Sequence, residues 1–219
     1  MVHLLSARRD GALDPVDRAS EVIFGLLMAM TFVGTIAVAE GGREELRTLL
    51  TAALGCNIAW GIADAVMYLV GIATEERRFR ALLQTLHDSD AANGRRVVAE
   101  GLMPELAASL NADDLERMRQ RLLDVPRPTG AARLGYAHYR AAVGVFVLVV
   151  LATFPVVLPY LFVSDVVTAL RVSQAIAVAT LFVAGAALAR WSGGNVWRHG
   201  FAIAMLGVVL IVVIVALGG

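Results

Sequence analysis

The sequence has few of the side chains that enzymes and disulfide-stabilised folds require. Its 219 residues include one cysteine and no lysine, and all 19 basic residues are arginine. The single Cys56 excludes an intrachain disulfide. There is no CxxC, HExxH or phosphate-binding glycine loop, so we expect no enzymatic activity and no permanently bound cofactor. Acidic residues balance the arginines, and a chain without a basic excess gives no reason to expect a nucleic-acid partner.

Apolar residues are what the sequence has in excess. They make up 58% of the chain, with a mean hydropathy of +0.69, whereas soluble domains are roughly 45–50% apolar. We therefore predict an integral membrane protein whose surroundings are the lipid bilayer. Residues 1–19 are charged and interrupted by proline, without an apolar signal-peptide core, and are expected to form an N-terminal arm.

Five apolar segments are long enough, or nearly so, to cross a bilayer. They are Val22–Ala39, Leu49–Ala73, Ala141–Val163, Val172–Ala189 and Phe201–Leu217. Ser20 is a candidate N-cap for the first segment. Pro155 and Pro159 are expected to kink or unwind the third segment near its end. The predicted fold is an all-α integral membrane protein with five transmembrane helices, two within residues 20–73 and three within residues 138–219.

Residues 74–137 form a polar insert between the second and third spans. The apolar residues of the insert recur at helical spacing, in Phe79, Leu82, Leu83 and Leu86 and again in Leu115, Met118 and Leu122. Pro104 is expected to begin or break a middle helix, and Asn111 with Asp114 forms a capping pattern. We predict a small amphipathic helical domain that is too short and polar to bury a large core alone.

The arginines predict the orientation of the chain in the membrane. The N-terminal arm, the insert with the start of the third span, and the loop between the last two spans hold all of them except Arg43, Arg47 and Arg171. By the positive-inside rule, the N-terminus and the insert face the cytoplasm and the C-terminus lies outside. We expect the membrane to be a bacterial inner (plasma) membrane, because an arginine-only, alanine-rich composition suggests a GC-rich bacterial gene.

Asp64 is the single charge within the second apolar segment and lies near its middle. An ionised carboxylate at the bilayer centre costs about 2.5–3.5 kcal/mol on the most lenient scale. At helical spacing, Asn57, Met67 and Tyr68 share its broad face. Two interpretations are open. The side chain is either protonated and hydrogen-bonded inside a helix bundle, or it forms an ion or proton site.

Four stretches have a recognisable order and spacing: Glu21–Gly25, Ala59–Leu69, Phe154–Tyr160 and Leu181–Gly193. Together they resemble the first four helices of the vacuolar iron transporter family of divalent metal transporters. The insert lies where that family carries its cytoplasmic metal-binding helices. The resemblance implies a homodimer that exports Fe²⁺ or Mn²⁺ from the cytoplasm. Proton movement in the opposite direction could drive this export.

The family pattern changes at the residues that would hold the metal. Members usually carry an acid at the position of Met28, a methionine at that of Ala65 and a glutamate near Asn57. The carboxylate and the thioether have therefore exchanged helices, which predicts a site where Asp64 faces Met28 and Thr31 near a two-fold axis. Oxygen and sulfur ligands together suit Fe²⁺ or Mn²⁺. Alternatively, Met28 and Thr31 only pack, or the metal site is lost and Asp64 has another role.

The predicted metal-ligating residues are Asp64, Met28, Thr31, Asn57, Met67, Glu100 and Glu105. The two glutamates belong to the insert and would collect cations before transport; the alternative is that they are solvated and paired with arginines. The competing function is a non-transporting membrane scaffold or sensor whose insert binds a partner. Asp64 discriminates between the two functions, because a polar path shared with the first span favours transport and a dry core favours the scaffold.

Overall fold

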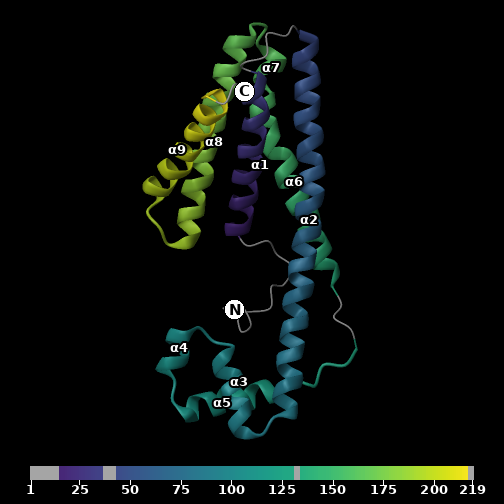
Figure 1. The fold of residues 1–219 in the computed structure, drawn as a ribbon, viewed down its shortest axis with the longest axis vertical. Coiled ribbons are helices and arrows are strands. Elements are labelled where there is room, and N and C mark those ends of the chain that lie inside the picture. The colour runs from purple at the N-terminus through teal and green to yellow at the C-terminus, as the bar shows by residue number, and fades with distance from the viewer. Residues whose placement is uncertain (1–14, 37–42, 131–133, 217–219) are drawn as a thin grey trace. The chain divides into compact units, whose positions relative to one another are not determined.

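The computed structural model describes residues 15–36, 43–130 and 134–216, and every regular element among them is an α-helix. The helices are α1 (Pro15–Ile36), α2 (Arg43–Asp88), α3 (Ala91–Glu100), α4 (Pro104–Ser109), α5 (Ala112–Leu123), α6 (Tyr136–Val157), α7 (Pro159–Phe162), α8 (Val166–Ser192) and α9 (Val196–Ala216) (Figure 1). Within these ranges, α2, α6, α8 and α9 are long and apolar enough to cross a membrane. The expected all-α membrane architecture is confirmed at this level, and the fifth span stays a prediction for α1.

The chain divides into two compact units. We call Ala12–Val66 with Arg140–Gly219 the bundle unit, and Met67–Tyr139 the small unit. The helix α2 runs unbroken across the predicted boundary at residue 74. It contains no proline, and the Glu76–Arg80 ion pair, 2.8 Å between Oε1 and Nε, spans one turn just beyond that boundary.

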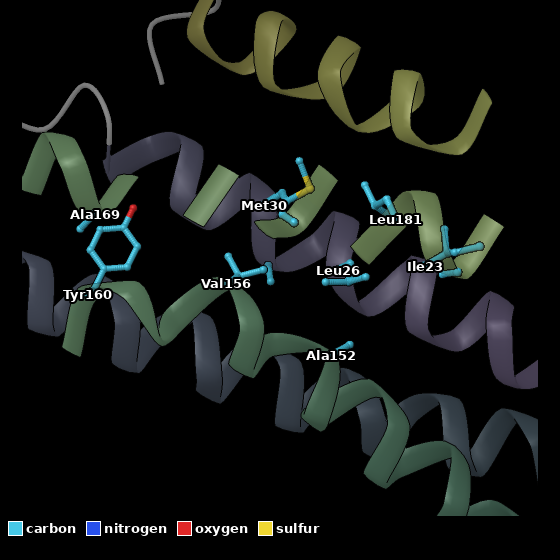
Figure 2. Close-up of a cluster of buried hydrophobic side chains, with 11 residues drawn as sticks. Ile23, Leu26, Met30, Ala152, Val156, Tyr160, Ala169 and Leu181 are labelled. Atoms are coloured by element: carbon cyan, nitrogen blue, oxygen red, sulfur yellow. The ribbon is translucent and has the colours of Figure 1, made fainter. Parts of the chain in front are cut away.

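The core of the bundle unit lies among α1, α6, α7 and α8. Leu26 of α1, Val156 of α6 and Leu181 of α8 are fully buried there (Figure 2). The helix α9 packs on α8 and α1. The crossing of α8 and α9 is close, because a Cβ on Gly185 would lie 2.9 Å from the carbonyl oxygen of His199. A small residue at the contact lets two membrane helices approach to this distance.

The long helices begin before the predicted apolar segments, and two of these starts have a clear local reason. The helix α8 begins at Val166 rather than near residue 172, because the Asp165 carboxylate accepts hydrogen bonds from the backbone N–H and hydroxyl of Thr168. The prediction that Ser20 caps α1 is wrong. The helix already begins at Pro15, and the Ser20 hydroxyl donates 2.9 Å back to the carbonyl of Val16.

The third span is interrupted where its prolines predict an interruption. The helix α6 ends at Val157, and α7 starts at Pro159 after a single residue, Leu158. Pro155 and Pro159 each lack the N–H that would continue the helical hydrogen-bond ladder. In the same region the Ser173 hydroxyl of α8 donates 2.6 Å to the backbone carbonyl of Val156. A side chain of a neighbouring helix thus satisfies a carbonyl beside the interruption.

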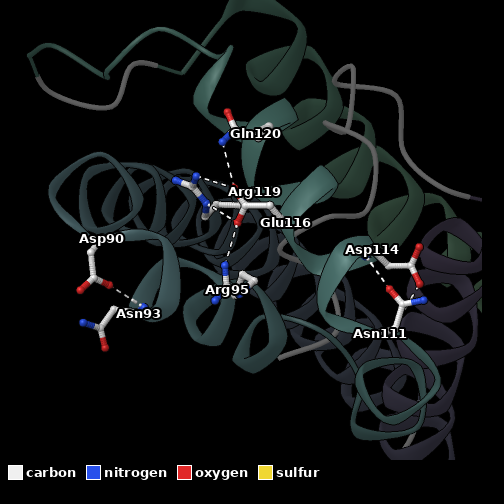
Figure 3. A network of polar contacts seen from close by, with 8 residues as sticks. All are labelled: Asp90, Asn93, Arg95, Asn111, Asp114, Glu116, Arg119 and Gln120. Atoms are coloured by element: carbon white, nitrogen blue, oxygen red, sulfur yellow. Dashed lines mark hydrogen bonds and ion pairs between the residues drawn. The ribbon is translucent and has the colours of Figure 1, made fainter.

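The small unit packs α3, α4 and α5 around buried Leu86, Val98 and Leu102. Its helix starts follow the sequence signals. Pro104 is the first residue of α4, and Asn111 and Asp114 form a reciprocal capping box at the start of α5 (Figure 3). Both expectations are confirmed.

An arginine-carboxylate network joins α3 to α5 in the same unit. Glu116 accepts from Nε and Nη2 of Arg119, at 2.9 and 2.6 Å, from Arg95 at 3.3 Å and from Gln120 at 2.9 Å (Figure 3). These donors, Arg119 first, lower the pKa of Glu116 from 4.5 to about 2. Arg119 is itself buried, and Gly94 of α3 leaves the space that its side chain occupies.

Candidate ion or proton site

Asp64 meets a second carboxyl group across the contact of α2 with α1. Its side chain lies close enough to Glu21 for the two carboxyl groups to interact. One turn away, the rings of Phe24 and Trp60 stack at 5.5 Å between centroids. Glu21 precedes Phe24, while Asp64 follows Trp60, so the two helices run antiparallel at this point. Antiparallel neighbours are what a short connection between spans favours.

Two neighbouring carboxyl groups in an apolar bundle are costly to ionise together. Two neighbouring carboxylates repel each other, so a shared proton or a bound cation would lower the energy of the pair. The Oδ2 atom of Asp64 is buried and has no hydrogen-bond partner. Asp17, one turn before Glu21 on α1, adds a further negative charge nearby. The arrangement is suited to attract and exchange positive charge.

A second polar contact lies two turns along α2. The side chains of Asn57 and of Thr153 on α6 are both fully buried, and the Asn57 amide donates to the Thr153 hydroxyl. The other Asn57 side-chain atom, Oδ1, is buried without a partner. Between the two contacts, Gly61 lies against Phe146 of α6, where an added Cβ would be 3.2 Å from the backbone oxygen of Phe146.

The structure places the other predicted ligands differently. Met28 follows Glu21 by seven residues, about 10 Å of helix rise, so α1 brings Glu21 rather than Met28 to the level of Asp64. The Thr31 hydroxyl donates 2.6 Å to the backbone carbonyl of Met28, which is the packing alternative expected for this threonine. The Met67 side chain is 64% exposed.

The insert glutamates lie on the surface of the small unit. Glu100 pairs with Arg96 at 3.8 Å, and both side chains are exposed. Glu105 is exposed in the first turn of α4. The arginine pairing of Glu100 fits the solvated alternative. Among the described residues, no cluster of three or more His, Cys, Asp or Glu side chains could hold a metal ion.

Sequence reasoning missed Glu21 and Thr153 as members of the site. In the sequence Glu21 is only the first residue of the stretch Glu21–Gly25, and Thr153 is an ordinary helix residue in an apolar run. Helical spacing groups residues on one helix but does not say which neighbour they face. The unpaired charge of Asp64 was the one available signal, because it requires a partner somewhere in the bundle.

The fold and site define an α-helical membrane protein with a carboxyl pair between two of its bundle helices. No protein-family model matches the sequence, and a search of curated proteins finds no match. The likeness to vacuolar iron transporters therefore rests on the stretches quoted above.

Proposed function

We propose that this protein exports a divalent metal ion, Fe²⁺ or Mn²⁺, from the cytoplasm of a bacterium across its inner membrane. The single observation that supports the proposal best is the Glu21–Asp64 carboxyl pair inside a bundle of apolar helices. Acids at such positions are expensive and typically belong to ion or proton pathways. In this proposal the N-terminus and the small unit face the cytoplasm.

The chemistry of the pair fits exchange between a metal ion and protons. Two carboxylates neutralise one divalent cation, and two protons neutralise the same two carboxylates. Binding one species therefore releases the other without leaving a net charge in the bundle. One chain supplies too few ligands for a complete shell, because a transition-metal ion takes at least four. In a two-fold dimer, a second Glu21–Asp64 pair would supply the rest.

Transport by purified protein in liposomes tests the proposal. Vesicles hold a fluorophore that responds to Mn²⁺ or Fe²⁺, and the initial rate is compared between wild type, Asp64→Asn and Glu21→Gln. Both variants keep side-chain shape and remove charge, so each rate is expected to fall by about tenfold or more. The matched control is Asp165→Asn, which stays within about twofold because Asn caps a helix as well as Asp does. Undiminished flux in Asp64→Asn, or no flux in wild type, would overturn the proposal.

A further inference from the structure

One face of α2 carries a continuous row of residues directed at the other helices of the bundle unit. Leu50, Leu54, Asn57, Gly61 and Asp64 recur at spacings of four and three, so they lie on one stripe. Two contacts along the row confirm its direction, since Gly61 meets Phe146 and Asn57 meets Thr153. The row ends on one side at the carboxyl pair and on the other at an open cavity.

The cavity has a volume of about 610 Å³ and lies entirely within the bundle unit. Its lining includes Leu50 and Leu54 of α2, Val157 of α6, Tyr160 of α7 and the polar residues Arg47 and Ser164. Such a space holds many water molecules, since one water occupies about 30 Å³ in the liquid. Its polar lining residues Arg47 and Ser164 are exposed.

Buried polar groups continue inward from this cavity. Ser173, fully buried, donates to the carbonyl of Val156, and the Tyr160 side chain lies beside it. One turn further along α6 is the buried Asn57–Thr153 contact, where Asn57 Oδ1 has no protein partner. A buried amide oxygen without a partner is costly, and a water molecule is the donor that such a position accommodates.

The row is closed at one point between Asn57 and Asp64. The ring and backbone of Phe146 press on Gly61, with the Phe146 Cδ2 atom 3.1 Å from where a Cβ would stand. An aromatic ring on a glycine leaves no room for water. Apolar packing of Phe146 on Gly61 therefore separates the polar groups on either side, and apolar constrictions of this kind gate pores by dewetting.

We propose that the face between α2 and α6 forms a proton route within one protomer, from the cavity at Tyr160 through Asn57 and Thr153 to the Glu21–Asp64 pair, gated by Phe146 on Gly61. Protons pass along water held by the buried hydroxyl and amide groups, bind a carboxylate at the inner end and leave it toward the opposite side of the membrane. No covalent bond changes, and the pH gradient supplies the driving force. The role of this route in metal exchange rests on the proposed function.

Proton flux in metal-free proteoliposomes tests the route directly. A pH gradient is imposed across vesicles that contain a pH-sensitive dye, and a K⁺ ionophore clamps the membrane potential. Asn57→Leu and the isosteric Thr153→Val remove the polar step, and each is expected to slow proton entry by about tenfold, the size of one outer-shell hydrogen bond in other sites. Phe146→Ala opens the constriction and should accelerate entry. The matched control is Thr180→Val on α8, whose hydroxyl bonds only its own helix, to Ile176.

The variants separate this route from the proposed function. Slower entry in Thr153→Val with faster entry in Phe146→Ala supports the route even if wild type moves no metal, in which case the proposed function alone fails. Metal flux that requires Asp64, together with proton entry unchanged in Thr153→Val and Phe146→Ala, overturns the route alone. If Asn57→Leu does not give a folded, monodisperse protein, Asn57→Asp is measured in its place. That variant keeps a polar group at the position and should retain proton entry. No proton entry in wild type overturns the route.

Discussion

Gly25 offers the sharpest test of how α1 sits on α6. A Cβ at this position would lie 3.0 Å from the Cβ of Ala152 and 3.0 Å from the backbone oxygen of Val149. Neither atom belongs to a flexible side chain, so in Gly25→Ala the two helices must separate by several tenths of an ångström. Such overpacking costs about 1–3 kcal/mol, and the better helix propensity of alanine returns about 1 kcal/mol of it.

The assay is thermal unfolding in detergent, followed by circular dichroism. Gly25→Ala is expected to lower the melting temperature, and because Glu21 is one turn away, the same shift should disturb its contact with Asp64. The matched control is Gly55→Ala on α2, where an added Cβ meets nothing within 4 Å. That substitution should leave stability unchanged or raise it by up to about 1 kcal/mol. Equal melting temperatures for the two variants would refute the close packing of α1 on α6.

Two further predictions concern the small unit. The pKa of Glu116 in the folded chain is about 2, below its ordinary value of 4.5. The Glu116 carboxylate therefore stabilises the fold above about pH 4.5, and this stability is lost as the pH falls toward 2. Glu116→Gln should flatten the acid-unfolding curve of the full chain between these pH values, and an unchanged curve would contradict the network. Asn111→Ala removes the cap that binds the backbone N–H of Asp114 and should destabilise α5 by about 1 kcal/mol, measured by hydrogen exchange of its first turn; unchanged exchange would exclude the capping box.

Features encoded by neighbouring residues were predictable from the sequence. The apolar runs indicated membrane helices, Pro104 marked the start of α4, and the Asn111–Asp114 pattern marked that of α5. Each depends on contacts within four residues, which sequence spacing states directly. The start of α8 was missed because apolar length was counted from beyond Arg171, although Asp165 is an ordinary capping signal.

The partner of Asp64 could not be predicted in the same way. A helix presents several faces, and which one meets α1 depends on packing around the whole bundle. The stack of Phe24 on Trp60 and the fit of Gly25 on α6 fix the rotation and height of α1, and these contacts join residues far apart in sequence. The polar partner of Asn57 was unpredictable for the same reason, since Thr153 is 96 residues away.

The position of Glu21 removes the reason for expecting Met28 to face Asp64. The sequence pattern places Met28 at the position of the family's acid, so the predicted exchange of a carboxylate for a thioether requires Met28 to face Asp64. In the structure α1 still brings a carboxyl group to α2, two turns earlier and level with Asp64. Under the proposed function, two carboxylates from two helices would balance a divalent charge without a sulfur ligand. Because Met28 lies about 10 Å of helix rise beyond Glu21, the structure gives no reason to place its thioether beside the carboxyl pair.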